Sequence, residues 1–218
     1  MIRQFWCGLL IVAVAACVTR RPAPTVQGVA SSSVAALAAA IELEAQRSDH
    51  ESDSKIRGGL AAEASRDAEA CLLLEPQASA CLYGRAVALG LNARAHPTRS
   101  GEFLSDMLAT LTRIESADPD YDEAGPARVQ ALVLIRAPGW PLGPGDAEAG
   151  LAAARRAVAL RPFYPPNLLA LAEALAKTGD SRGALENYLR ARDAALALPA
   201  APDRDEWLRE ADQELQRK

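Results

Sequence analysis

Apolar residues recur every three or four positions along most of the chain beyond residue 32. Near the C-terminal end, Leu168, Leu171, Ala172 and Leu175 follow this spacing, which places their side chains on one face of an α-helix. The pattern predicts helices at residues 32–47, 54–74, 79–92, 101–117, 124–136, 146–160 and 202–216, with two more on either side of Gly179 and Asp180.

Prolines interrupt this helical pattern at regular intervals. Pro76, Pro119 and Pro162 each follow a helix end and lie 43 residues apart, and Pro199 follows after 37. Regular helix ends are typical of arrays in which each helix pair buries its apolar face against the next. The last pair also resembles the tetratricopeptide pattern at Leu171, Ala172, Gly179, Ala184, Tyr188 and Ala191. We predict an all-α domain over residues 33–218, a tetratricopeptide-like array of about four helical hairpins with a C-terminal capping helix.

The stretch APGWPLGPGD, residues 137–146, separates the helices expected at 124–136 and 146–160. Its prolines and glycines cannot continue a helix, so we interpret it as a stiff connector at a hairpin tip. Trp140 in this connector has two interpretations. It either offers an aromatic contact to a partner or folds back over the core of its own hairpin.

The N-terminal residues form a separate segment. Phe5–Ala16 is an uninterrupted apolar run, too short to span a bilayer, and small residues then lead into Cys17. The stretch VAAC resembles the bacterial lipobox, which predicts a signal peptide at residues 1–16, lipidation of Cys17 and a flexible tether at residues 17–32. The alternative is an ordinary secretion signal or an uncleaved anchor. A lipoprotein would face the periplasm, and Val18 in place of the retention aspartate favours the outer membrane.

Composition narrows the classes of partner. Half of the residues are hydrophobic but only 5% are aromatic, so alanine, leucine and valine must supply most of the core. The formal net charge is −4 and the isoelectric point is near 5.3. Because no run of Lys or Arg forms a basic stripe, we do not expect a nucleic-acid partner.

No group of residues predicts catalysis or a cofactor. His50 and His96 lack a further ligand at metal spacing, so no zinc site is predicted. The acidic run Asp118–Glu123 lacks the glycine turn of a calcium loop, and we interpret it as a solvated helix start. Without a nucleophile motif or a phosphate-binding loop, the chain is expected not to be an enzyme.

Cys71 and Cys81 lie five residues before and five residues after Pro76. Equidistant positions on antiparallel helices can face each other, and the cell envelope is oxidising, so these cysteines are candidates for a disulfide. The alternative is two small buried residues with free thiols.

Three groups of residues between Tyr121 and Asp180 form a distinctive combination. The first is a Gly-Pro-x-Arg segment at Gly125, Pro126 and Arg128. The second is a Pro-rich loop that ends at Gly145 and Asp146. The third is a Leu-x-Pro segment followed by Pro-x-Asn, at Leu160, Pro162, Pro165 and Asn167. The combination resembles the T-component (TatT-like) lipoproteins of tripartite ATP-independent periplasmic (TRAP) transporters.

This resemblance implies a periplasmic binding component that engages the transporter's substrate-binding protein. It also implies an apolar small ligand and oligomerisation. The candidate residues for binding a ligand or partner are Tyr121, Gly125, Pro126 and Arg128, together with Trp140, whose place in the stiff loop would suit an aromatic contact. Without the resemblance, Arg128 is interpreted as a solvated helix-face residue. The alternative function is a tetratricopeptide scaffold lipoprotein that helps to assemble an envelope complex.

Overall fold

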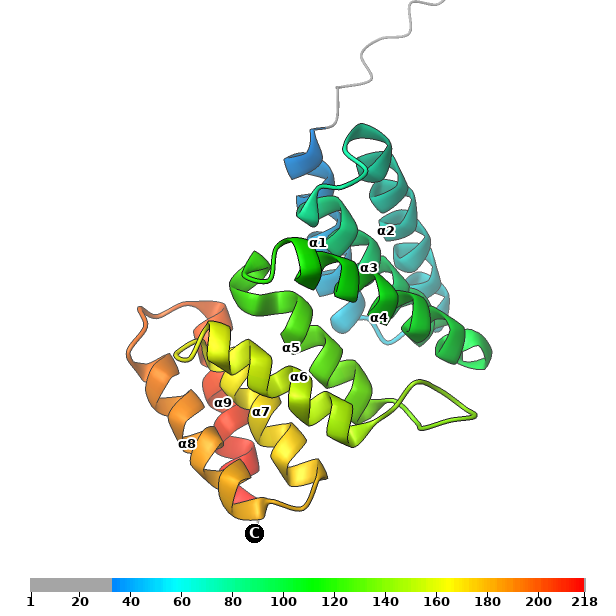
Figure 1. Cartoon of the computed structure of the whole chain (residues 1–218). Coiled ribbons are helices and arrows are strands. Elements are labelled where there is room, and N and C mark those ends of the chain that lie inside the picture. The colour runs from blue at the N-terminus through cyan, green and yellow to red at the C-terminus, as the bar shows by residue number, and fades with distance from the viewer. Residues whose placement is uncertain (1–32, 218) are drawn as a thin grey trace, which may run out of the picture. The chain divides into compact units, whose positions relative to one another are not determined.

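A computed structural model describes residues 33–217, in which helices joined by loops make up the fold and no β-strand is present beyond one isolated bridge between Gly139 and Gly145 (Figure 1). The helices are α1 Val34–Asp49, α2 Ser54–Leu74, α3 Ser79–Ala95, α4 Ser100–Ala117, α5 Tyr121–Arg136, α6 Ala147–Leu160, α7 Pro165–Lys177, α8 Ser181–Leu196 and α9 Pro202–Gln216, with a short 3-10 helix at Pro97–Arg99. The all-α prediction is confirmed. The expected signal peptide, Cys17 and the tether lie outside the described residues.

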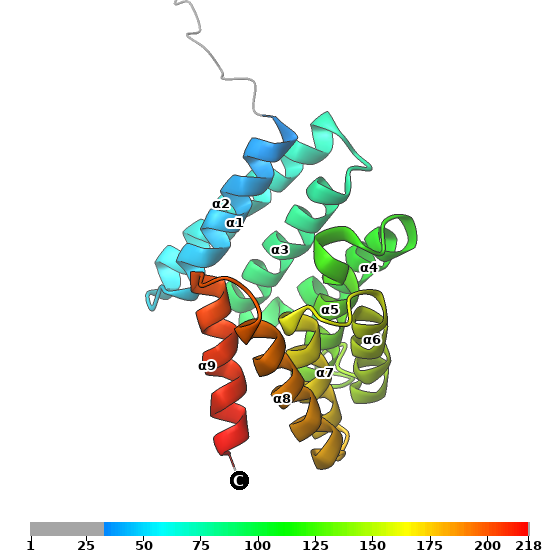
Figure 2. The ribbon, with the colours of Figure 1, turned by 90° about the vertical axis from the view of Figure 1, so that its left-hand side faces the viewer.

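Consecutive helices pair as four hairpins, α1–α2, α3–α4, α5–α6 and α7–α8, and α9 packs on α8 (Figure 2). Each hairpin contacts the next one in the chain, and the first helices also pack in pairs, α1 on α3 and α5 on α7. The first helices therefore share one side of the array. Helix α9 closes the last hairpin with Trp207, Ala211 and Leu215, as expected for a capping helix.

Local side-chain bonds fix where several helices begin. Asp53, Asp146 and Asp180 each accept hydrogen bonds from backbone N–H groups in the first turn of the helix that follows. The glycines that precede two of these caps serve different purposes. Gly179 has φ +93°, whereas a Cβ on Gly145 would overlap the carbonyl oxygen of Ala137.

Alanine supplies much of the buried contact between helices. Ala64, Ala131, Ala154 and Ala172 are fully buried, and such small side chains let helix axes approach closely. Larger residues fill the remaining space, among them Leu111 and Ile114 of α4 and Leu168 of α7. Among the described residues, no helix is both long enough and apolar enough to cross a bilayer.

A disulfide joins the end of α2 to the start of α3. Cys71 and Cys81 are fully buried, with an S–S distance of 2.05 Å and a Cα–Cα distance of 5.2 Å. Both pack against Leu37 of α1. The bond therefore ties the first hairpin to the second.

Candidate functional site

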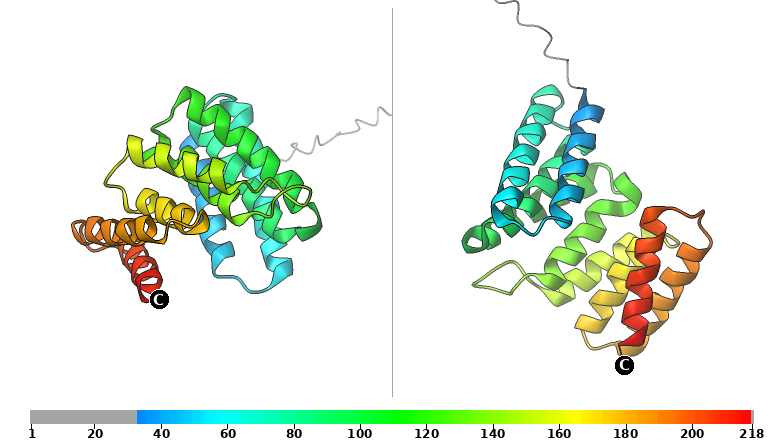
Figure 3. Two further views of the ribbon diagram at one scale, coloured as in Figure 1. Left: turned by 60° about the horizontal axis from the view of Figure 1, so that its bottom comes forward. Right: turned by 180° about the vertical axis from the view of Figure 1, so that it is seen from behind.

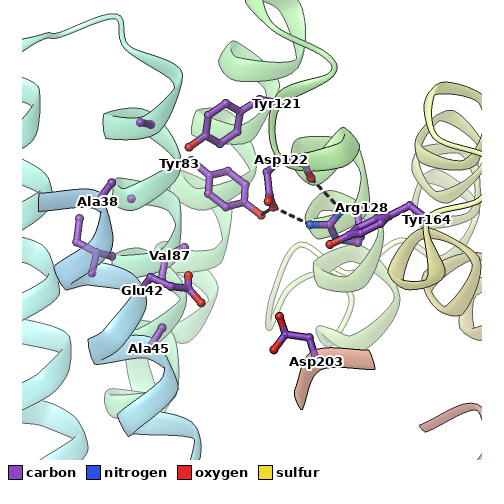
Figure 4. Close-up of a pocket in the computed structure, with 13 residues that line it drawn as sticks. Ala38, Glu42, Ala45, Tyr83, Val87, Tyr121, Asp122, Arg128, Tyr164 and Asp203 are labelled. Carbon is purple, nitrogen blue, oxygen red and sulfur yellow. Dashed lines mark hydrogen bonds and ion pairs between the residues drawn. The ribbon is translucent and has the colours of Figure 1, made fainter. Parts of the chain in front are cut away.

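A cavity of about 510 Å³ opens between α1 and α3 on one side and the starts of α5, α7 and α9 on the other (Figure 4). We call it the cleft. Its apolar side comes from one face of α1 and one face of α3, where residues one helical turn apart line the space. These residues are Ala38, Ile41, Ala45, Ala80, Gly84 and Val87.

The polar side of the cleft carries three tyrosines, Tyr83, Tyr121 and Tyr164. Its charged groups are Glu42, Asp122, Arg128 and Asp203. Apolar walls with a few convergent polar groups are typical of binding sites in proteins.

The start of α5 has an unusual backbone. Asp122, Glu123 and Ala124 all have positive φ, at 49°, 54° and 63°, so a left-handed turn precedes the right-handed part of the helix. Each non-glycine residue in this region costs about 1–2 kcal/mol. The turn therefore needs compensating contacts from its surroundings.

Gly125 and Pro126 fit the point where the right-handed helix starts. A Cβ on Gly125 would lie 2.7 Å from an Asp122 carboxylate oxygen and 2.9 Å from the Tyr83 hydroxyl oxygen, so a larger residue there would displace both side chains. Pro126 is buried and lies in the first right-handed turn, where its missing N–H costs no helical bond. The Gly-Pro pair thus has a structural purpose beside the cleft.

Arg128 supplies most of the contacts that hold the left-handed turn. Its Nη1 donates to the carbonyl oxygens of Asp122 and Glu123, each at 3.2 Å, and its Nη2 forms an ion pair with the Asp122 carboxylate at 2.7 Å. The guanidinium also lies 5.2 Å from the centre of the Tyr164 ring. Arg128 is only 9% exposed, so its interpretation as a solvated helix-face residue is wrong.

Asn167 completes the support from the neighbouring hairpin. It is fully buried, and its Oδ1 accepts a hydrogen bond from Arg128 Nη1 at 3.1 Å. Its Nδ2 donates to the carbonyl oxygens of Glu123, Ala157 and Arg161. One amide side chain therefore joins the turn, the end of α6 and the start of α7.

Asp122 links this network to the aromatic side of the cleft. Its Oδ2 accepts from the Tyr83 hydroxyl at 3.0 Å as well as from Arg128. Burial raises the pKa of Tyr83 well above its usual range, and burial is also the main cause of the raised pKa values of Tyr121 and Tyr164. The three phenols are therefore neutral at physiological pH.

The acidic run is not simply a solvated helix start, which corrects the sequence interpretation. Asp120 and Glu123 each pair with Arg161 at 3.0 Å, and Asp122 pairs with Arg128. Asp120 and Glu123 fix the turn to the end of α6, and Asp122 fixes it to Arg128 of α5, contacts that no local pattern shows.

Trp140 lies away from the cleft. It is 90% exposed in the loop that projects from the α5–α6 hairpin (Figure 3), so the interpretation as a core cover is wrong. The loop is fixed at its base, where the N–H groups of Gly145 and Asp146 donate to the carbonyl oxygens of Pro138 and Leu134. With Arg99 it borders a shallow hollow at the start of α4.

Four of the five predicted binding residues thus meet at one place. Tyr121 and Arg128 line the cleft, Gly125 and Pro126 lie directly behind them, and Trp140 is separate. Sequence reasoning missed several residues of the site, namely Glu42, Tyr83, Asp122, Tyr164 and Asp203. Only Asp122, within the acidic run, and Tyr164, just before Pro165, were near a recognised motif.

The described residues contain no group of three or more His, Cys, Asp or Glu side chains placed to hold a metal ion. The arginine of the cleft and one of its carboxylates are already paired with each other.

Comparison with known proteins supports the class of fold. No protein-family profile matches the chain, and no curated protein sequence matches it. Among solved structures, a thermophilic tetratricopeptide repeat (TPR) protein of Thermus thermophilus superposes with a TM-score of 0.57 at 20% identity, over 83% of this chain and 92% of that one. The chain therefore has a TPR-like array of helical hairpins.

Proposed function

We propose that this protein is a non-catalytic binding component of the bacterial cell envelope that holds a partner in the cleft. The observation that carries the proposal is the Arg128 network, which fixes a left-handed turn at the edge of a cavity lined by the first helices of the array. TPR-like arrays commonly recognise proteins or peptides on the surface that these helices form. A preformed surface binds with less loss of conformational entropy.

The chemistry of the cleft favours binding over catalysis. Arg128 and Asp122 neutralise each other, and the Tyr83 hydroxyl already donates to Asp122. None of the three is placed as a free acid, base or nucleophile. Their bonds fix the conformation of the turn beside the cleft, and a fixed conformation favours binding.

The proposed partner is the substrate-binding protein of a TRAP-type transporter, and the chain would be tethered to the membrane by a lipid on Cys17. Support comes from the sequence resemblance over Tyr121–Asp180 and from the lipobox-like stretch before Cys17. The structure brings the Gly-Pro-x-Arg and Pro-x-Asn segments of that resemblance into contact. A small ligand carried by the partner would fit the cavity volume of about 510 Å³.

The alternative is a scaffold lipoprotein that assembles an envelope complex. The exposed apolar side chains of Trp140 and Leu142, 90% and 75% exposed, favour this alternative because they offer a contact outside the cleft. Affinity purification of the mature chain from envelope extract, followed by mass spectrometry, separates the two functions. Transporter proteins would support the first, and components of an assembly complex would support the second.

A filled cleft provides the direct test. Ala38→Trp places a large ring in the cleft, whereas Ala39→Trp adds the same ring at an exposed position of α1 that does not line it. We expect Ala38→Trp to abolish binding of the substrate-binding protein in surface plasmon resonance and Ala39→Trp to leave it unchanged, with circular dichroism showing that both variants fold. Equal binding by both variants would mean that the cleft is not the contact.

A further inference from the structure

The positive and negative charges that line the cleft do not cancel, because the only cation among the described residues that line it, Arg128, is already paired with Asp122. The Arg128 guanidinium donates hydrogen bonds to Asp122, Glu123 and Asn167, and its side chain is 10% exposed. Its positive charge is balanced by the Asp122 carboxylate at 2.7 Å. It therefore offers little attraction to an anion in the cleft.

Two carboxylates remain without a cation. Glu42 of α1 and Asp203 of α9 both line the cleft, and neither forms an ion pair within residues 33–217. Glu42 accepts one hydrogen bond, from Gln46 at 3.2 Å. Figure 4 shows both carboxylates directed into the open space from different helices. The unbalanced charge of the cleft is therefore negative.

The neutral groups of the cleft suit the body of an amphipathic cation. The Tyr164 hydroxyl also points into the space, where its oxygen can accept a hydrogen bond. The floor beside Glu42 is built from alanine, isoleucine and valine side chains. Lys and Arg side chains have this form, with an apolar stem that packs on such a floor and a cationic head that remains polar.

We infer that the cleft binds an alkylammonium or alkylguanidinium group, with its cationic head between Glu42 and Asp203 and its aliphatic stem against the α1 and α3 floor. The inference rests on the proposed binding role of the cleft and names the chemistry of what enters it. The group is either a free amine or a basic side chain of the partner protein. A purely apolar ligand would form no ion pair with either carboxylate.

Titration with small probes tests the charge. Pentylamine and pentylguanidine carry the cation, and 1-pentanol is a neutral molecule of similar length. By NMR titration of the full mature domain we expect both cations to bind saturably, and pentanol to bind at least roughly tenfold more weakly. Binding of the two cations should also weaken as the salt concentration is raised, because salt screens the exposed charges. Equal binding of pentanol and pentylamine would overturn the inference.

Variants that remove one or both negative charges test whether Glu42 and Asp203 hold the cation. Glu42→Gln and Asp203→Asn should each weaken pentylamine binding about two- to fivefold, the contribution of an exposed ion pair, and the double variant roughly tenfold. Glu69→Gln, exposed on α2, and Asp205→Asn, in the same first turn as Asp203 but not lining the cleft, are matched controls that should bind as wild type does. A double variant that binds like wild type would overturn the inference.

Two further measurements separate the sources and the two proposals. The first uses a glycine heptapeptide with one central lysine, and the same peptide with norleucine in place of lysine is its uncharged control. The lysine peptide will bind more tightly than pentylamine if a segment of the partner is the natural ligand. It will bind no more tightly than pentylamine if a free amine is the natural ligand. Loss of partner binding in Ala38→Trp, together with wild-type pentylamine binding in the Glu42→Gln/Asp203→Asn variant, would overturn the cation inference and keep the proposed function. Full partner binding in Ala38→Trp would instead overturn the proposed function.

Discussion

Arg128 and Asn167 are 39 residues apart and share a hydrogen bond of 3.1 Å in the interior of the domain. Both also donate to the carbonyl oxygen of Glu123, Arg128 at 3.2 Å and Asn167 at 3.0 Å. The left-handed turn beside the cleft is thus held by two consecutive hairpins, through α5 and α7. The shape of the cleft consequently depends on how these hairpins stack.

Arg128→Met should destabilise the domain strongly. The change removes the cation paired with the Asp122 carboxylate and the Arg128 donor to two carbonyl oxygens of the left-handed turn, so we expect the free energy of unfolding to fall by about 2–4 kcal/mol. Urea denaturation followed by circular dichroism measures the change. Arg85→Met, an exposed arginine on α3, is the control and should shift the value by less than about 0.5 kcal/mol. Similar values for the two variants would show that the Arg128 contacts do not support the fold.

The Cys71–Cys81 disulfide should contribute measurably to stability. The bond closes a short loop, with a sequence separation of 10, for which chain entropy gives roughly 2–3 kcal/mol. The Cys71→Ser/Cys81→Ser variant should unfold at correspondingly lower urea, and dithiothreitol should lower the stability of wild type but not of this variant. Mass spectrometry of non-reduced peptides that finds both thiols free would contradict the bond.

Glu44 should make the domain less stable as pH rises. Its carboxyl group is buried between α1 and α2, with Oε2 unpaired among the described residues, and burial, helped by Asp67 and Glu63, raises its pKa from 4.5 to about 7. Because the folded-state pKa lies above the unfolded-state value, the protonated Glu44 carboxyl contributes fully to the free energy of unfolding below about pH 4.5. This contribution is lost as the pH rises through about 7.

Glu44→Met removes this titration. At about 1.4 kcal/mol per pKa unit, the variant should be more stable than wild type by roughly 1–3 kcal/mol at pH 8 and should show a flatter profile from pH 5 to 8. Urea denaturation at several pH values gives both numbers. Glu69→Met, an exposed glutamate on α2, is the control, and a variant profile as steep as that of wild type would exclude Glu44 as the cause.

Trp140→Ala should affect partner binding rather than stability. Because the side chain is 90% exposed, its loss should change the free energy of unfolding by less than about 0.5 kcal/mol while weakening binding of the partner protein. Trp207→Ala is the matched comparison, since Trp207 packs edge-on against Tyr164 with ring centres 5.6 Å apart and should cost about 2–3 kcal/mol. Unchanged partner affinity in Trp140→Ala would remove the loop from the interface.

Cys17→Ala should release the protein from the membrane, because a cysteine thiol is the site at which the proposed lipid is attached. Fractionation of cells followed by immunoblotting measures the distribution. Cys7→Ala, which changes a cysteine within the expected signal peptide, should leave the protein with the membrane. A Cys17→Ala protein that still sediments with membranes would contradict lipid anchoring.

The helices were predictable to within a few residues, because their signals are local. The helix expected at 54–74 matches α2 at both ends, and the one expected at 202–216 matches α9. The start of α5 was not predictable in the same way. The helix was expected to begin at residue 124, whereas α5 begins at Tyr121 and its next three residues have positive φ.

The sequence by itself determined that this protein is an array of helical hairpins, where most helices begin and end to within a few residues, and that the segments around Arg128 and Asn167 form a distinctive combination. Apolar spacing, proline stops and aspartate caps act over about four residues, so they can be read along the chain. Only the tertiary structure decided that Arg128 is buried, that Asp122 meets Tyr83 across 39 residues, and that Trp140 faces outward. Those outcomes depend on how separate hairpins pack, because burial and ion pairing are set by neighbours in space and not by neighbours in sequence.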